Sequence, residues 1–452
     1  MAEAVQFYRL ATSCFGGVGS HKGGRLVLSL FFKAVLGVQR VFHFDSLTDV
    51  GFAVLTGGRR ILSRDTLGGL VRAVSTRAVG KFLRLTQPVV TAARSLSISI
   101  DEHTVARFTR KFLIPKGFHT IRNKKMRAEK LFFSFDVGMR ALLDLVVTPG
   151  NGRLARIAST MLAALRSRHP SDQLRVVLDA GAAQSHREML MLADENHNQV
   201  LLVRTPRRTA YLDRWKALPE TCFTHYDEPG RYTGAPAKRI HVTETTTPVR
   251  ADKHSPTRQV RTIVAREEKR RGNDRWHALF VFRDNATDAL ALIKEFRARQ
   301  HHEQTYRVLL HDGFVDTVPS GYNKKSPNPD RPGFRRNAIT LYAWVTGLAV
   351  NTLTSLTASL PTRFKLAHPR TLRRWWLNFP ADLYLTDRAL IVVLHPRWFR
   401  DWWEQKVEQL NEKTIRLPWL NHRLVLYSLD APIRPSAEPS SDPAHEPSGV
   451  WC

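Results

Sequence analysis

The spacing of apolar side chains between residues 95 and 203 constrains the fold more than any other feature of this chain. Leu96, Ile98 and Ile100 alternate with serines, the pattern of a half-buried strand, and this strand is predicted to end at Asp101. The predicted order is strand, strand, strand, helix, strand, helix, strand, over residues 95–101, 131–137, 141–147, 154–165, 174–178, 189–193 and 200–203. This order predicts an α/β domain with its functional residues at strand ends.

The chain is strongly basic. Its 452 residues contain 69 Lys plus Arg against 40 Asp plus Glu, a net charge of +29. Such a positive field suits the phosphate backbone of a nucleic acid, and the excess is spread through folded segments instead of one tail. The alternatives are a merely basic soluble protein and one that docks on anionic membranes. Because 43% of the residues are hydrophobic, we expect a globular chain of several domains.

Cysteine usage and hydropathy indicate a cytoplasmic protein. Cys14, Cys222 and Cys452 are too few and too scattered for a disulfide framework, and no Cys-x-x-Cys pair offers a zinc site. The most apolar early stretch, 26–42, is interrupted by charged residues, so we expect a buried helix and no membrane partner. Neither a phosphate-binding nor a dinucleotide-binding glycine loop occurs, so no nucleotide cofactor is expected.

Changes in composition divide the chain into six segments. The first, 1–93, is predicted to be a helical DNA-binding or dimerisation domain, whose short helices at 45–55, 65–74 and 75–85 form a helix-turn-helix or a plain bundle. The others are a first core part (94–204), a β-rich insertion (205–275), a second core part (276–322), a small α+β C-terminal region (323–431) and a disordered tail (432–452).

Within the C-terminal region we expect a helix at 338–360 and a hairpin of 383–385 with 389–394. The region is also rich in tryptophan, around 373–376 and 398–403. These rings either form a core or contact a DNA backbone.

Three acidic residues occupy defined places in the predicted core. Asp101 and Asp179 follow strands, and Glu303 lies on a helix after a cap at Asn285 or Thr287. Carboxylates gathered without a cation would repel each other, and hard oxygen ligands suit Mg²⁺ or Mn²⁺. Two such ions would activate a water or a 3′-hydroxyl for phosphoryl transfer. The helix stripe that contains the glutamate is Phe296, Arg299, Glu303, Tyr306 and Leu310.

Each of these residues also has a structural alternative, because an acid after a strand often only forms a turn. Asp136 ends a predicted strand too and competes with Asp101, whereas Glu102 is expected to face the opposite side of the sheet. Arg204 follows the strand 200–203, where it either neutralises phosphate or caps the sheet.

The segment 296–310 carries a specific resemblance. Phe296, Arg299 and Glu303, with Arg297 and the pair Tyr306-Arg307, resemble the signature Tyr-x2-Arg-x3-Glu-x6-Lys of DDE transposases. The chain is similar to the cut-and-paste group from bacterial insertion sequences. In that group an RNase-H-like core, a mixed sheet flanked by helices, is interrupted by a β-rich insertion before the glutamate.

The resemblance implies that Asp101, Asp179 and Glu303 are the catalytic, metal-binding triad for Mg²⁺ or Mn²⁺. It implies an endonuclease and strand-transfer enzyme that binds terminal inverted repeats and target DNA as a homodimer, in the bacterial cytoplasm near the nucleoid. A hairpin intermediate is typical of the group. Arg299 would contact a terminal phosphate or orient the glutamate. The predicted DNA-binding residues are Arg299, Arg204, Arg297, Arg307 and Phe296.

Two positions depart from the signature: Phe296 replaces its tyrosine and Leu310 its lysine. These changes favour an alternative, a catalytically impaired DNA-binding protein derived from a transposase. A tyrosine recombinase would need a further Arg and Tyr set beside His-x-x-Arg. That motif occurs at His119 and Arg122, as expected by chance in so basic a chain.

Overall fold

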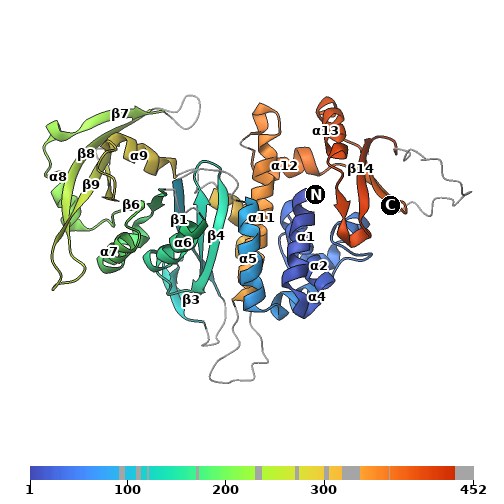
Figure 1. The fold of residues 1–452 in the computed structure, drawn as a ribbon. Helices are drawn as coiled ribbons and strands as arrows, with labels where there is room; N and C mark the ends of the chain where they lie inside the picture. Colours follow the sequence, from blue (N-terminus) through green and yellow to red (C-terminus); the bar gives the residue numbers. More distant parts are fainter. Residues whose placement is uncertain are drawn as a thin grey trace, which may run out of the picture. The chain divides into compact units, whose positions relative to one another are not determined.

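The computed structural model describes residues 1–90, 97–107, 114–119, 122–168, 173–229, 237–269, 274–299, 305–317, 336–365 and 367–432. The chain forms two compact units, a terminal unit (Met1–Val90 with Arg307–Cys452) and a central unit (Thr91–Tyr306). The protein is a mixed α/β protein with one large mixed sheet (Figure 1). Both ends of the sequence thus belong to one unit, while the finer division into six segments stays a prediction.

The central unit contains a ten-stranded sheet of order β2-β3-β1-β5-β6-β10-β9-β8-β7, in which β4 also pairs with β3. Strands β1, β3 and β4 are antiparallel neighbours, and β5 and β6 run parallel to β1. The elements of this half are β1 (Ser97–Ala106), β2 (Lys116–His119), β3 (Lys124–Asp136), β4 (Ala141–Pro149), α6 (Leu154–Arg168), β5 (Arg175–Leu178), α7 (His186–Glu195) and β6 (Val200–Arg204). The predicted alternation of strands and helices is confirmed.

The parallel register aligns three strands at one level. Ile100 of β1 is opposite Leu178 of β5, which is opposite Val203 of β6. The prediction that β1 ends at Asp101 is wrong, because β1 continues to Ala106 by pairing with β3. Asp101 therefore lies inside a strand, at the level where its parallel neighbour β5 stops.

Strands of the region 205–275 extend the same sheet. β10 (Arg275–Phe282) pairs antiparallel with β6 on one side and with β9 (Arg258–Glu267) on the other. Next to β9 lie β8 (Lys238–Val249) and β7 (Thr224–Glu228), and helix α8 (Thr209–Lys216) precedes them in the chain. The hydrogen-bond ladder is thus continuous from β1 to β7.

Apolar side chains cover both faces of this sheet. On one face, Met161 of α6 and Met189 of α7 belong to a core that also includes α8. On the other face, Leu292 and Ile293 of α9 (Ala289–Ala298) pack on strands β5, β6, β8, β9 and β10. Full burial of one such side chain stabilises the fold by about 1.5–3 kcal/mol, so the sheet is held from both sides.

Helix α9 differs from its prediction at both ends. It begins after Asp288, whose carboxylate accepts a hydrogen bond from a backbone amide of the first turn, and not after Asn285 or Thr287. It ends at Ala298, and residues 300–304 lie outside the described residues, Glu303 among them. The single helical stripe expected over 296–310 is therefore only partly described.

The terminal unit is mostly helical. Its long helix α11 (Asn337–Ala358), predicted at 338–360, contacts α2, α4 and α5. Its length and composition would suffice to cross a membrane, but most of it is buried, and Trp344 Nε1 donates to Thr86 Oγ1 at 2.8 Å. This is the burial of a core helix. The other helices are α1 (Ala2–Cys14), α2 (Ser20–Leu36), α3 (Val50–Leu55), α4 (Arg64–Ala73) and α5 (Thr76–Val90).

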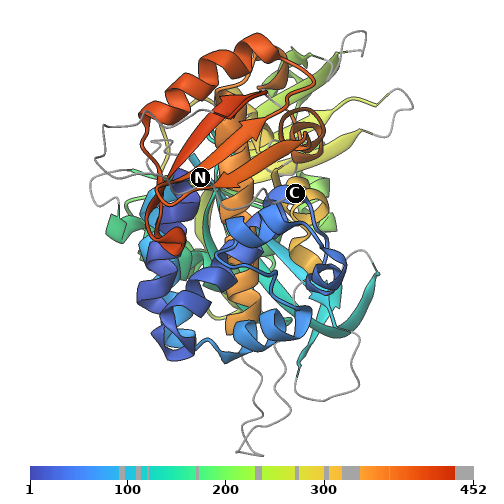
Figure 2. The same ribbon diagram turned by 90° about the vertical axis from the view of Figure 1, so that its right-hand side faces the viewer.

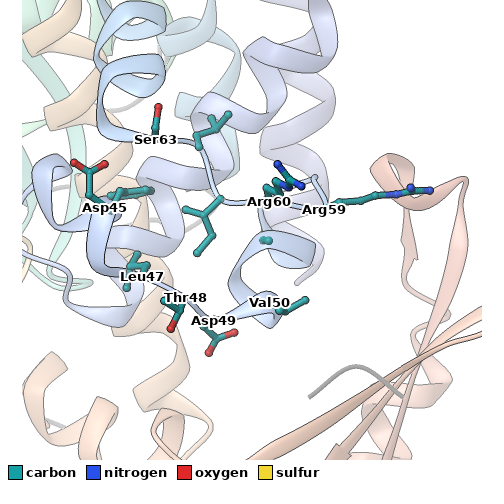
Figure 3. Close-up of a pocket in the computed structure, with 12 residues that line it drawn as sticks. Asp45, Leu47, Thr48, Asp49, Val50, Arg59, Arg60 and Ser63 are labelled. Atoms are coloured by element: carbon teal, nitrogen blue, oxygen red, sulfur yellow. The ribbon is translucent and has the colours of Figure 1, made fainter. Parts of the chain in front are cut away.

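The helix expected at 45–55 is shorter than predicted, because α3 begins only at Val50, after the cap Asp49. Beside it lies a hollow of about 430 Å³ lined by residues between 44 and 63 (Figure 3). Its carboxylates serve the fold: Asp49 caps α3, and Asp45 pairs with Arg64 at 3.1 Å. Contact of α4 and α5 with DNA stays a prediction.

The C-terminal residues of this unit form a four-stranded sheet of order β11-β12-β14-β13. The predicted hairpin is confirmed, with β11 (Ala381–Leu385) antiparallel to β12 (Ala389–Leu394). β12 and β14 (Arg423–Leu429) are parallel, and α13 (Arg400–Glu412) packs against β14 (Figure 2).

A lysine is buried in the helical core of the terminal unit. Lys33 of α2 is 0% exposed, and among the described residues its Nζ has no hydrogen-bond partner. Nζ lies 4.9 Å from the centroid of the Tyr342 ring and 5.9 Å from that of Phe314. Burial, together with the nearby Arg373 guanidinium, lowers the pKa of Lys33 to about 7.

We expect Lys33→Met to stabilise the terminal unit near pH 7. The pKa of Lys33 is lower in the folded protein than in the unfolded chain, so the folded protein binds fewer protons. The buried amine therefore lowers the free energy of unfolding of the wild type most below pH 7. This loss shrinks as the pH rises toward 10.5. The gain at pH 7 is at most about 5 kcal/mol. Urea unfolding of both proteins between pH 7 and 10 measures it. A stability difference that does not shrink with pH, or an equal gain from exposed Lys22→Met, would contradict this origin.

Candidate functional site

Asp101, Asp179 and Arg204 follow the aligned residues of β1, β5 and β6 directly. Ile100, Leu178 and Val203 are opposite one another in the three strands, and each residue of the site comes one position later. The parallel pairing therefore brings together residues that are far apart in the sequence. Arg204 Nη1 lies 3.2 Å from Asp179 Oδ1. The structure thus places two of the three predicted acids side by side.

Arg299 lies against both acids. It follows the last residue of α9, is 6% exposed, and its Nη1 is 3.4 Å from Asp101 Oδ2. Its Nη2 is 3.6 Å from Asp179 Oδ2. The planar guanidinium presents several donors in a fixed fork, which allows one side chain to serve two carboxylates.

The two aspartates differ electrostatically. Burial raises the pKa of Asp101 to about 6, Arg299 opposes this rise, and the charge of Asp179 adds to it. Burial would raise the pKa of Asp179 as well, but Arg299, the Ala180 amide and Arg204 together hold that pKa below its usual value. The pair is therefore a partly buried negative site, with the Asp101 and Asp179 side chains 24% and 34% exposed, and two arginines balance its charge.

The donor set fits a divalent cation. Two carboxylate oxygens face one positively charged group, and oxygen ligands of this kind are those that Mg²⁺ and Mn²⁺ prefer. Among the described residues no group of three or more His, Cys, Asp or Glu gathers, and Glu303 is not one of the described residues. Asp101 and Asp179 are the part of the predicted triad that the structure places together.

Ion pairs that no local sequence pattern predicts hold α9 in place. Arg175 of β5 binds Glu295 of α9, with Nη2 to Oε2 at 2.7 Å, and also Asp284 at 3.0 Å. Arg297 of α9, which is 9% exposed, pairs with Glu228 of β7. These partners are separated in the chain by up to 120 residues, so no local pattern could reveal them.

Two of the predicted DNA-binding residues face inward. Arg297 is engaged by Glu228, and Phe296 belongs to the core between α9 and the sheet, so neither is free to meet a phosphate. Helical spacing alone could not separate this inward role from a DNA-facing one. Arg307 is exposed and belongs to the terminal unit. Contact of Arg299 and Arg204 with DNA stays a prediction.

The competing acids have other partners. Asp136 accepts a hydrogen bond from the Met139 amide at 2.7 Å and so shapes the turn between β3 and β4. Glu102 binds Lys130 Nζ at 2.8 Å. Both contacts agree with the choice of Asp101 over its neighbours.

A histidine near the acids was not singled out from the sequence. His103 is two residues beyond Asp101 on β1, and its ring lies 5.4 Å from the Tyr306 ring, which also meets Phe133. Burial, with His119 nearby, lowers the pKa of His103 to about 4, so it is neutral at physiological pH. The sequence pattern that could have identified His103 is the alternation of side chains in a strand, which places residues 101 and 103 on one face.

Comparisons with known proteins give little more. No protein-family model matches the chain, and no curated protein is similar to it in sequence. Among solved structures, the chain is similar to a piggyBac transposase synaptic complex with hairpin DNA, with a TM-score of 0.42 and 11% identity over 80% of this chain and 73% of that chain. A TM-score of 0.42 is too low to assign a function, so the function is inferred from the site.

We expect Arg299→Gln to destabilise the central unit by about 1–3 kcal/mol at pH 8, since two partly buried carboxylates then face each other without their shared cation. The loss should be smaller at pH 5, because Asp101, with a pKa of about 6, takes up a proton there. Denaturant unfolding in metal-free buffer measures both values. Exposed Arg156→Gln on α6 is the control, and an equal loss at both pH values would contradict the electrostatic cause.

Proposed function

We propose that this protein is a DNA transposase that cleaves and joins DNA through Asp101, Asp179 and Glu303, in the manner of DDE transposases of bacterial insertion sequences. The observation that carries the proposal is the placement of Asp101 and Asp179 at one level of the sheet, against buried Arg299. The antiparallel β1, β3 and β4 followed by parallel β5 and β6 support an RNase-H-like core. The net charge of +29 supports DNA as the substrate.

Asp101 and Asp179 would hold Mg²⁺ or Mn²⁺, and Glu303 would complete the set. Such ions supply an activated water or 3′-hydroxyl and a positive charge for the leaving oxygen. The two aspartate side chains stay 24% and 34% exposed, so ions can reach them, and Arg299 balances their charge until DNA and ions arrive. Arg204 remains 23% exposed while it holds Asp179, so its guanidinium can also face a phosphate.

The partners in this proposal are double-stranded DNA at the inverted-repeat ends of the element, a target DNA, and a second copy of the chain when DNA is bound. The setting is the bacterial cytoplasm near the nucleoid. The basic character of the described α4 and α5, with Arg72, Arg77, Lys81 and Arg84, supports a role of these helices in holding the ends.

Cleavage of a labelled duplex carrying the repeats that flank the reading frame tests the proposal. With Mg²⁺ or Mn²⁺, the full chain should nick this duplex, and Asp101→Asn, Asp179→Asn and Glu303→Ala should each lower the rate by more than about 100-fold, because loss of a direct ligand exceeds loss of a residue behind it. Gel-shift binding should persist. Glu102→Gln, next to Asp101 but bound to Lys130, is the matched control. Nicking that survives all three substitutions would refute the triad.

One observation favours a second candidate, a DNA-binding protein without cleavage activity. Phe296 is packed in the core and has no hydroxyl to offer a phosphate, and Leu310 stands in place of the signature lysine. End binding without metal-dependent nicking would support this candidate.

A further inference from the structure

A pocket of about 250 Å³ lies in the terminal unit, far along the chain from the acid pair. It lies between the π-helical segment Arg373–Leu377 and the residues that follow β12. Its lining includes Arg374, Trp375, Asn378, Phe379, Arg397 and Trp398. A pocket of this size is smaller than typical sites for drug-sized ligands, so it suits a group as small as one aromatic ring system.

Two tryptophans, Trp375 and Trp398, form walls of this pocket. The rings of Trp375 and Trp398 are 5.3 Å apart at 65°, so one edge faces the other ring. Trp398 is 53% exposed, a large apolar surface to leave in water. Trp376, by contrast, is 1% exposed and stacks on Phe399 at 4.4 Å. The buried Trp376 thus supports the pair, in which Trp375 is half-buried and Trp398 is exposed.

The backbone is unusual on both sides of the pocket. Trp375 belongs to a π-helical turn, a form often found at functional sites. Phe399, directly after Trp398, has φ of 59°, a left-handed conformation that is costly for a bulky residue. Phe399 stacks on the buried Trp376 ring, which stabilises this conformation directly beside the exposed Trp398.

The charge around the pocket is positive. Arg374 is exposed, and its Cζ lies 5.5 Å from the Trp375 ring centroid. Arg397 is exposed too, and in the part of the chain that the structure describes neither arginine forms an ion pair. No acid lines the pocket. Asn378 adds an amide that can both donate and accept a hydrogen bond.

We propose that this pocket binds an unpaired base of single-stranded DNA, which stacks on the exposed Trp398 ring next to Trp375 while Arg374 and Arg397 contact the flanking phosphates. Aromatic rings beside free cations are how proteins hold single strands, whereas bases inside a duplex already stack on each other. The choice of DNA over RNA rests on the proposed function. The binding itself needs neither metal nor cleavage.

Binding of a fluorescein-labelled oligothymidine to the full chain in EDTA tests the proposal. Trp398→Ala should weaken this binding by about 5- to 100-fold, the usual effect of losing one stacking ring, and Trp398→Phe should restore most of it. Binding of a duplex of equal length should change by less than about twofold. Phe42→Ala is the matched control, because Phe42 is also 53% exposed and lies in the same unit.

Three results would overturn the proposal: unchanged oligothymidine binding by Trp398→Ala, an equal loss for the duplex, or tighter Trp398-dependent binding of oligouridine than of oligothymidine. Thermal melting of the variants separates misfolding from lost contacts, and if Trp398→Ala melts early, Arg397→Gln replaces it with the same expectation for the single strand. This test measures binding and not cleavage, so its outcome does not depend on whether Asp101, Asp179 and Glu303 are the catalytic residues.

Discussion

The hydrogen-bond register among β1, β5 and β6 is the constraint on which the candidate site depends. The three strands enter the sheet from distant parts of the chain, and their parallel pairing brings Asp101, Asp179 and Arg204 to one level. In a strand, a slip of one residue turns every side chain to the other face of the sheet. The apolar core on both faces therefore specifies the charged site as well, because only one register buries the correct side chains.

Charge balance is the second element of the site. Two partly buried carboxylates this close together would oppose folding if they were left without a cation, but one guanidinium meets both. The two acids do not share it equally, since the pKa of Asp101 is raised to about 6 and that of Asp179 is lowered. Neighbouring acids with different proton affinities are a recurrent property of sites where charge changes during a reaction.

Local patterns were sufficient to predict most strands of the central sheet, several helices, and Asp101 and Asp179 as neighbours, because these depend on side-chain period and on residue type. They failed where the length of a strand or the direction of a side chain depends on a residue far away in the sequence. β1 continues past Asp101 because β3 pairs with it, and an aspartate read by itself indicates the end of a strand. Arg297 has the same spacing as a DNA-facing arginine, and only the presence of Glu228, 69 residues away, shows that it faces inward. The exposed Trp398 and the buried Trp376 are likewise indistinguishable from composition.

The pairing of Arg297 with Glu228 ties helix α9 to the outer part of the sheet. Glu228 belongs to β7, at the outer edge of the sheet, and a second acid, Glu267 of β9, lies 3.7 Å from the same guanidinium. Both acids are supplied by the region 205–275, whose strands β8 and β9 also pack against α9. This region therefore neutralises the same cation that it helps to bury, and it is joined to the core by charge as well as by strand pairing.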